Sequence, residues 1–598
     1  MVDNGGDGLT LADASSELVD SVVRGNAGRG IHAANTKLTL NGATVEGHGQ
    51  EGLLLDDSVA ELAGSTVTAN RAAGVLAQAR STVDAKASFV TRNQGDGITL
   101  RGSNASLDST TIDANGGFGL HAVDSNASTS NQTQIVNHPN EGVLLEESTA
   151  KFVNSAVRDN DGIGMRLSDT KMTLEGTTVA ANGRDGLSLD ASSATVRGST
   201  VDANGGVGLA ETNRSRVTLQ GSVISNHPGD AITLAASSVD LKGSQLNNNR
   251  GRGVFSNDGT LLGSEATISG QGGHALELND SKADLRDSTL DGNGGHGLLA
   301  TASTVAFSNV TLTDHPQDAL RLTQSSMDLR GSTVSGNRGR AVELNESEVT
   351  LNNSTLENNG GDGIHALSSS VELRNGSVVR GNGGYGVDAQ DATVTLSNTT
   401  VENHPQDGLR LVNSPASLTQ SQIRANQGWA LAASDRTAVQ FVESVLDGNA
   451  QGGLSLTSAV ASLRGGQISN NAGLGVQVTA RSAMLFIGTA VSANAGGISL
   501  DSSTASIRDG VISNNQGRGL EVLNSSAASV ISSQIADNAT DGVALEGSLV
   551  SLRDTQVTGN RGFGVLADAN SVVAGRDNVI ATNATDMNEH VPERIRKK

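Results

Sequence analysis

The chain has 598 residues, of which 74 are glycine, 6 are proline and none is cysteine. The lack of cysteine excludes disulfides, thiolate nucleophiles and cysteine-based zinc sites. The 63 acidic and 41 basic residues give a net charge of −22, which disfavours nucleic acid and anionic membranes because the long-range field repels phosphate. No apolar stretch of the sequence approaches the roughly 20 residues of a transmembrane helix. We therefore expect no nucleic-acid partner and no membrane insertion.

The first residues enter a repeating unit midway. Asn4 occupies the position that Asn182 holds in a complete unit, so residues 1–20 are expected to form an incomplete first coil, as in a segment of a longer chain. These residues lack the basic start and apolar stretch of a signal peptide. An uncovered strand edge invites pairing with another chain, which predicts a homo-oligomer or end-to-end association.

Residues 177–198 illustrate the complete unit. Three short stretches of alternating polar and apolar residues are separated by corners rich in Gly, Asn, Asp and Ser, and the pattern restarts at residue 199. The unit recurs in steps of 21 to 23 residues to residue 583. Such a unit cannot bury its apolar face alone, so the repeat implies a stack of coils with three short strands each. The sequence predicts an all-β protein, a single parallel β-helix solenoid of about 26 coils of about 22 residues, right-handed because parallel crossovers prefer that hand.

Two positions of the unit form columns. The third is aliphatic in every coil, as in Val179, and is expected to point inward. The sixth is usually asparagine, as in Asn182, and is expected to take the left-handed backbone conformation at a corner and to form an amide ladder. Residues 584–598 depart from the pattern and are predicted to form a polar C-terminal cap or tail.

A recurring Asn-x-Gly-x-Gly-aliphatic sequence, at residues 26–31, 93–98 and 382–387, resembles that of the right-handed parallel β-helix family, the pectate-lyase-like superfold. The resemblance covers nearly the whole chain and implies the fold. It also implies that a site, where one exists, lies on an exposed parallel sheet, as in uronan lyases and epimerases. The sequence signatures of mannuronan epimerases and pectate lyases are absent, and so are two of the elements of polygalacturonases.

A longer period of four coils covers about residues 43–443. A histidine interrupts the Asn column once in each block, 88 to 90 residues apart, and an acidic residue follows three positions later. These residues are His48, His138, His227, His315 and His404. One interpretation is a row of ligand sites; the other is duplication of one turn, in which imidazole replaces Asn as a local hydrogen-bonding group. One histidine and one carboxylate are too few ligands for a metal.

The ninth and twelfth positions are expected to point outward and vary most in chemistry. From His274 to Trp429 they concentrate imidazoles, carboxylates and guanidiniums, together with the only Tyr and the only Trp of the chain. By residue type alone, the resemblance implies Tyr385 and His365 as acid and base, and Arg340 and Arg410 as partners of a uronate carboxylate. The full predicted substrate-binding set is His296, Arg321, Arg340, Asp362, Asp388, Arg410 and Trp429. The competing interpretation of this face is a ladder of opposite charges, each pair worth about 0.2–1 kcal/mol.

The favoured function is an extracellular structural or binding β-helix, such as a stalk, spike or adhesin segment, at a bacterial or phage-like surface. The alternative is a carbohydrate-active β-helix, a lyase or epimerase acting on a uronate-containing polysaccharide. A polysaccharide or cell-surface glycan is the expected partner of either. We expect no metal and no other cofactor; Ca²⁺ remains an alternative that no motif indicates, because the Ca²⁺-binding nonapeptide does not repeat here.

Overall fold

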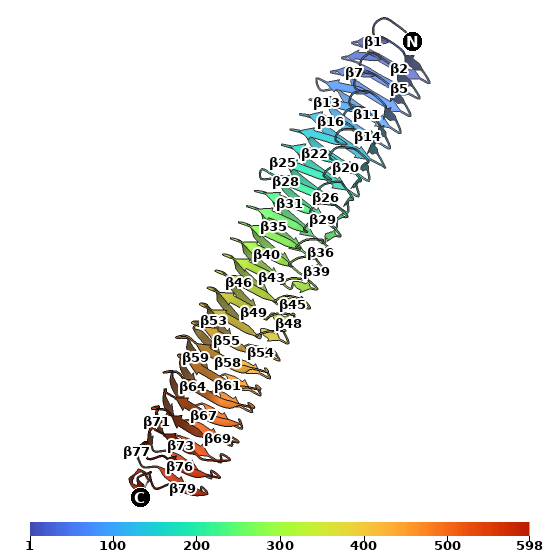
Figure 1. Ribbon diagram of the computed structural model, residues 1–598. Coiled ribbons are helices and arrows are strands. Elements are labelled where there is room, and N and C mark those ends of the chain that lie inside the picture. The colour runs from blue at the N-terminus through green and yellow to red at the C-terminus, as the bar shows by residue number, and fades with distance from the viewer. Residues whose placement is uncertain (597–598) are drawn as a thin grey trace. The chain divides into compact units, whose positions relative to one another are not determined.

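The computed structural model describes residues 1–596 and comprises two compact units, Met1–Leu299 and Ala300–Lys598. Lys597 and Lys598, the end of the predicted polar tail, lie outside the described residues. Both units consist of short strands joined by tight corners (Figure 1). The helical content of residues 1–596 is a single turn of 3-10 helix, η1 (Glu593–Ile595).

One coil of the N-terminal unit shows the construction. Its three strands are β24 (Thr178–Ala180), β25 (Leu187–Asp190) and β26 (Ser193–Arg197). They pair in parallel with β27 (Thr200–Asp202), β28 (Leu209–Thr212) and β29 (Arg216–Gln220) of the next coil. Repetition of these pairings produces three parallel sheets in each unit, termed sheet A (the β24 type), sheet B (the β25 type) and sheet C (the β26 type). The predicted all-β parallel solenoid with three short strands per coil is confirmed.

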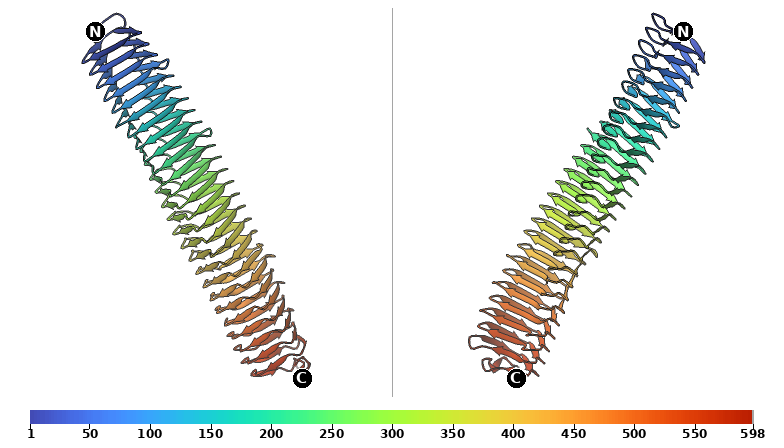
Figure 2. Two further views of the ribbon diagram at one scale, coloured as in Figure 1. Left: turned by 180° about the vertical axis from the view of Figure 1, so that it is seen from behind. Right: turned by 45° about the vertical axis from the view of Figure 1, so that its right-hand side comes forward.

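Sheet B carries most of the predicted site residues. In the N-terminal unit it runs from β1 (Leu9–Ala12) and β4 (Ile31–Ala34) to β34 (Val254–Asn257) and β37 (Leu276–Asn279). In the C-terminal unit its strands are β43 (Leu320–Thr323), β46 (Val342–Asn345), β49 (Ile364–Leu367), β52 (Val387–Gln390), β55 (Leu409–Val412), β58 (Trp429–Ser434), β61 (Gly452–Thr457), β64 (Leu474–Thr479), β67 (Gly496–Asp501), β70 (Leu520–Leu523), β73 (Val543–Glu546), β76 (Phe563–Ala567) and β79 (Thr585–Met587). Within each unit these strands stack coil upon coil (Figure 2).

The inward positions form the predicted aliphatic columns. Val179, Leu187, Leu189 and Val196 are each at most 1% exposed. The pairing places Val179 beside Val201 and Leu187 beside Leu209 of the next coil. Burial of each such side chain contributes roughly 1.5–3 kcal/mol, so the core of each unit is a set of continuous aliphatic columns.

The Asn column closes the corner between sheets A and B. Asn182 is 2% exposed, and its Nδ2 donates to Oδ1 of Asn204 at 2.8 Å and to the carbonyl of Val157 at 3.2 Å. The amide ladder is therefore present. The predicted left-handed conformation of the asparagine is wrong, because the preceding residue, Ala181, has the positive φ of 53°. That residue reverses the chain and leaves the amide free to point along the stack.

Columns of serine and threonine form hydrogen bonds between successive coils at the other two corners. Between sheets B and C, the backbone N–H of Thr170 donates to Oγ of Ser192 at 3.0 Å, and Ser192 N–H donates to Ser215 Oγ at 3.1 Å. Between sheets C and A, Thr177 N–H donates to Ser199 Oγ at 3.1 Å. Each corner thus has a buried polar side chain that satisfies a backbone N–H which would otherwise lack a partner.

The outermost coils differ from the interior ones. In β1 the inward Leu9 and Leu11 are only half-buried, whereas the equivalent Leu187 is 0% exposed. In the predicted tail, η1 buries Ile595, and the carbonyl of Ile595 accepts a hydrogen bond of 2.8 Å from Nδ2 of Asn578. The described part of the tail therefore packs against the last coils.

One inward position breaks the aliphatic pattern. Glu211 on β28 is 1% exposed, and its register places it between Leu189 and Leu234 in the sheet B column. Neither carboxylate oxygen has a hydrogen-bond partner. Burial raises the pKa of Glu211 well above its ordinary value, because ionisation in an apolar column is costly.

We expect Glu211→Leu to stabilise the protein. The unfolded chain ionises Glu211 above its ordinary pKa of about 4.3 and the folded chain does not, so the wild type loses stability as pH rises above that value. The variant should gain about 1–3 kcal/mol in the free energy of unfolding, the cost of burying a polar group without a partner, and the gain should be larger at pH 7 than at pH 4. Urea unfolding at both pH values measures the gain. Glu211→Gln, which cannot ionise, should show the same change in the pH dependence; a gain in Glu211→Leu that is equal at both pH values would contradict this reading.

Candidate functional site

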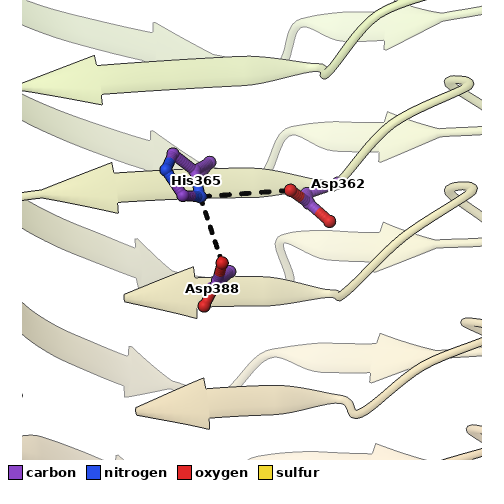
Figure 3. Close-up of side chains that lie close together, drawn as sticks. All are labelled: Asp362, His365 and Asp388. Carbon is purple, nitrogen blue, oxygen red and sulfur yellow. Dashed lines mark hydrogen bonds and ion pairs between the residues drawn. The ribbon is translucent and has the colours of Figure 1, made fainter. Parts of the chain in front are cut away.

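The outward face of sheet B in the C-terminal unit brings several predicted residues together. Asp362 lies in the turn before β49, His365 on β49 and Asp388 on β52. His365 stands opposite Asp388 in the strand pairing. Its Nδ1 lies 3.1 Å from Oδ2 of Asp388 and 4.0 Å from Oδ2 of Asp362, so the imidazole nitrogen faces both carboxylates (Figure 3). These three residues are termed the Asp-His-Asp cluster.

Backbone and guanidinium groups hold the carboxylates of the cluster in place. Oδ1 of Asp362 accepts the backbone N–H of Tyr385 at 2.8 Å, and its Oδ2 pairs with Nε of Arg340 at 3.1 Å. Arg340 also donates to Glu343 Oε2 at 2.6 Å. Arg410 Nη1 donates to Oδ1 of Asp388 at 2.8 Å, which leaves Oδ2 of Asp388 to His365.

The hydrogen bond between His365 and Asp388 sets their protonation. It raises the pKa of His365 above the ordinary value, against the opposing effect of burial. Burial acts to raise the pKa of Asp388, but the hydrogen bonds from His365 and Arg410 outweigh it, so the pKa of Asp388 is lowered. The two shifts agree and favour an imidazolium–carboxylate pair.

Asp388 is nearly buried although its position in the strand is an outward one. It lies on the outward face but is only 7% exposed, because His365 on the preceding coil and Arg410 on the following coil contact it from both sides. The position is outward as the alternation of the strand predicts, and the longer neighbouring side chains account for the burial.

Tyr385 lies one coil after Asp362 and is half-buried. The guanidinium carbon of Arg410 is 5.5 Å from the centre of its ring, a cation–π distance. Burial raises the pKa of the Tyr385 phenol, with Arg410 acting in the opposite direction. A phenol with a raised pKa is better suited to donate a proton than to act as a phenolate base.

The remaining predicted residues are spread more widely. Arg321 on β43 is exposed and stands opposite Glu343, which the predicted set omits although the coil period places it in the same column as His365. Trp429 begins β58, and its ring lies against Gly452 of the next coil, where an added Cβ would come within 2.2 Å of ring carbon Cζ3. One face of this indole is therefore occupied by the protein.

His296 belongs to the N-terminal unit. It is 6% exposed, and its ring stacks on that of His274, with centroids 5.1 Å apart and planes 18° apart. The sequence places His296 in an outward column, and the stacking against His274 accounts for its low exposure. Its backbone N–H donates to His274 Nδ1 at 2.9 Å, which ties the two coils together.

The five histidines of the four-coil period are all buried. His48, His138, His227, His315 and His404 are each at most 1% exposed and lie in the Asn column. Nε2 of His404 contacts Nδ2 of Asn382 at 3.3 Å, and its Nδ1 contacts Oδ1 of Asn426 at 2.9 Å. This network assigns the proton to Nδ1, so a neutral imidazole relays donor and acceptor as an amide does. The placement favours the interpretation as a replacement for Asn over a row of ligand sites.

We expect His404→Asn to reduce acid sensitivity. Burial lowers the pKa of His404 to about 4, so the unfolded chain takes up the proton first and stability falls as pH drops from about 6.5. Asparagine keeps the ladder and does not titrate. Between pH 7 and pH 5 the variant should lose about 2 kcal/mol less of the free energy of unfolding than the wild type, as measured with urea.

His590→Asn is the control, because the side chain of His590 is 39% exposed. Equal pH dependence in the His404 and His590 variants would show that the buried imidazole ring accepts a proton without penalty.

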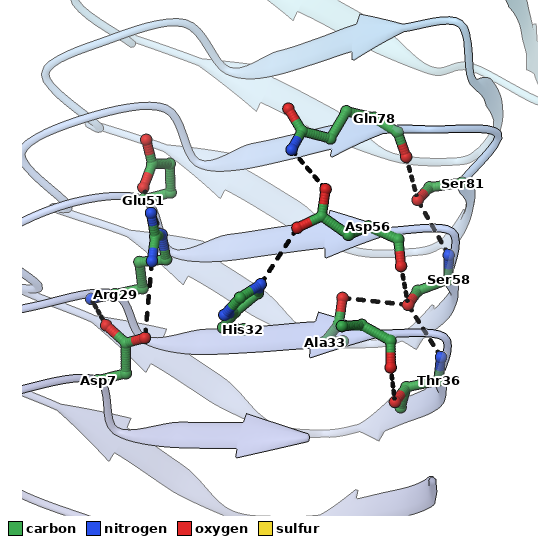
Figure 4. Close-up of polar contacts among 11 residues, drawn as sticks. Asp7, Arg29, His32, Ala33, Thr36, Glu51, Asp56, Ser58, Gln78 and Ser81 are labelled. Atoms are coloured by element: carbon green, nitrogen blue, oxygen red, sulfur yellow. Dashed lines mark hydrogen bonds and ion pairs between the residues drawn. The ribbon is translucent and has the colours of Figure 1, made fainter. Parts of the chain in front are cut away.

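Charge ladders on sheet B are not confined to the Asp-His-Asp cluster. In the N-terminal unit Arg29 lies between Asp7 and Glu51, at 3.7 Å and 3.3 Å, and His32 pairs with Asp56 at 3.1 Å (Figure 4). Arg252 likewise joins Asp230 at 2.8 Å and Glu277 at 3.0 Å. Cross-coil pairing of opposite charges is thus a recurrent feature of this sheet.

The family model described as "Right handed beta helix region" matches residues 3–155, 141–283, 273–419, 412–548 and 457–588. The chain belongs to this right-handed β-helix family. No curated protein matches the sequence. The described residues of this β-helix protein include no helix that is long and apolar enough to cross a membrane.

Several solved structures resemble the chain weakly. A periplasmic alginate epimerase, AlgG, is 10% identical over 53% of this chain and 76% of its own, with a TM-score of 0.28. The A-module of the Azotobacter vinelandii mannuronan C-5 epimerase AlgE4 is 12% identical over 73% and 90%, with a TM-score of 0.20. The tailspike protein of E. coli bacteriophage HK620, solved with a hexasaccharide, is 10% identical over 64% and 73%, with a TM-score of 0.20. Similarity at this level gives no information on activity.

Proposed function

We propose that this protein is an extracellular structural or binding β-helix, such as a stalk, spike or adhesin segment. The carrying observation is that arginines of sheet B are paired within the protein. Arg340 is engaged by Asp362 and Glu343, and Arg410 by Asp388. A guanidinium reserved for a substrate carboxylate would have to give up these partners first, which reduces the net gain from binding.

The same pairing in the N-terminal unit supports the proposal. Arg252 is bound by Asp230 and Glu277 and lies over the ring of Phe255, at 3.8 Å from its centre. Arginine–carboxylate pairs that recur along a sheet are expected where their role is to stabilise the stack of coils. The function of such a protein resides in the spacing and surface that its coils provide.

A carbohydrate-active β-helix is the second candidate. The observation that favours it is the position of Tyr385. It is half-buried beside Arg410 and lies one coil from His365, which pairs with Asp388. A phenol and an imidazole on one face can move a proton to and from a sugar carbon. On this alternative, a uronate-containing polysaccharide would be a substrate.

Incubation with alginate, pectate and hyaluronan distinguishes the two candidates. Ultraviolet absorbance detects the unsaturated ends left by a lyase, and proton NMR detects an epimerised uronate. We expect no product with any of the three polymers. A product that the wild type forms and Tyr385→Phe does not would overturn the structural proposal in favour of catalysis.

Calorimetry with the same polymers tests binding on this face. If a polyanion binds here, Arg340→Ala and Arg410→Ala should each weaken binding by about 1–3 kcal/mol, the range for hydrogen bonds to charged groups. Arg252→Ala is the matched control, a ladder arginine of the N-terminal unit. Equal weakening in all three variants would indicate a nonspecific charge effect and no site at Tyr385.

Exposure of the protein to protease on intact cells of its source tests the proposed location. Digestion from outside is expected, and full protection until the cells are lysed would contradict an extracellular position.

A further inference from the structure

We propose that Asp362, His365 and Asp388 bind one divalent transition-metal ion, with Zn²⁺ the best match. Among the described residues these three each offer one ligand atom, and the three atoms lie within 4.8 Å of one another. This inference is independent of the proposed function, because a metal-binding site is compatible with either a structural or a catalytic β-helix.

The spacing of the ligand atoms suits a small cation. A tetrahedral Zn²⁺ ion at about 2.0–2.2 Å from nitrogen and oxygen ligands requires these atoms to be about 3.4 Å apart. Nδ1 of His365 lies 3.1 Å from Oδ2 of Asp388 and 4.0 Å from Oδ2 of Asp362 (Figure 3). Because all three ligand atoms lie within 4.8 Å of one another, rotation of the two carboxylates would bring them to one ion.

The surrounding contacts orient the ligands as outer partners do in metal sites. Each carboxylate has one oxygen fixed: Oδ1 of Asp362 by the N–H of Tyr385, and Oδ1 of Asp388 by Arg410. The second oxygen of each carboxylate is turned toward the imidazole. Groups that hold ligands in this manner raise metal affinity and are commonly required for it.

Arg340 competes for Oδ2 of Asp362 at 3.1 Å. It also has Glu343 as an acceptor at 2.6 Å, so it stays paired when Asp362 turns to the metal. A bound ion would also take the place of the proton between His365 and Asp388.

The donor set selects the class of metal. Ca²⁺ prefers six to eight oxygen ligands, whereas imidazole nitrogen suits Zn²⁺ and its transition-metal neighbours. One nitrogen and two carboxylate oxygens supply three protein ligands, the number that the protein provides in Zn²⁺ sites whose fourth ligand is water. The Ca²⁺ alternative from the sequence is therefore the weaker match here.

The test uses the full chain, freed of metal with a chelator and titrated with Zn²⁺ by calorimetry. The wild type should bind one ion that is lost, or weakened at least about tenfold, in His365→Gln and in Asp388→Asn. Visible absorption of Co²⁺ reports the ligand geometry of the same site. Ca²⁺ in excess should leave the Co²⁺ spectrum unchanged.

His121→Gln is the matched control. His121 also lies between two carboxylates, Asp96 at 3.3 Å and Glu146 at 3.5 Å, but these face opposite ring nitrogens, so one ion cannot reach all three. This variant should bind Zn²⁺ as the wild type does. Circular dichroism and thermal unfolding verify that each variant is folded.

A measurement on the wild type removes any dependence on variant folding. With labelled histidine, substoichiometric Co²⁺ should perturb the imidazole signal of His365 before those of the other histidines. Three results would overturn the proposal. The wild type binds no Zn²⁺, or His365→Gln and Asp388→Asn bind Zn²⁺ as tightly as the wild type does, or Ca²⁺ readily displaces Co²⁺.

Discussion

Everything in each unit depends on one constraint: after 21 to 23 residues the chain must return to the same place, one strand spacing further along. Hydrogen bonds between coils enforce the return, and the corners make it geometrically feasible. At the corner between sheets A and B, Gly186 has no room for a side chain, because an added Cβ would lie 2.4 Å from Val201 Cγ1 and 2.7 Å from the carbonyl of Gly208. The polar columns at the three corners then form hydrogen bonds with the backbone groups that have no partner in the strand ladders. Aliphatic burial supplies the driving force, and the corners determine the register in which it acts.

Much of the fold was predictable from sequence because the period itself specifies which residues become neighbours. Val179 and Val201 share a column for no other reason than their 22-residue separation. The predictions that were wrong or missing concern residues whose conformation or burial depends on neighbouring residues and not on position in the repeat alone. The left-handed residue at the corner is Ala181 and not Asn182. Asparagine tolerates that conformation best, but the sequence does not show which residue makes the turn. Glu211 was missed although the alternation along β28 places it inward, which the register with Leu189 confirms.

The candidate site was predictable in its members but not in its geometry. The sequence placed Asp362 in one outward column and His365 and Asp388 in another, and the period predicts that the latter two are adjacent. Which nitrogen of the imidazole faces the carboxylates, and which oxygen of each carboxylate remains available, depends on rotamers and on Arg340, Arg410 and the N–H of Tyr385. These are contacts among four successive coils, and no pattern within one coil encodes them. The burial of Asp388 has the same origin.

The distinction between a charge ladder and a metal site therefore depends on which ring nitrogen each carboxylate faces, and on what holds the other oxygen of each carboxylate. His121 and His365 have the same composition around them, one imidazole and two carboxylates. At His121 one carboxylate faces Nδ1 and the other faces Nε2, so these contacts link neighbouring coils without forming a site for one ion. At His365 both acids face a single nitrogen, and their other oxygens are held elsewhere. Because each coil contacts only its neighbours, such a difference requires changes in two or three outward side chains and none in the core. Outward columns can thus acquire or lose chemistry while the inward columns keep the fold.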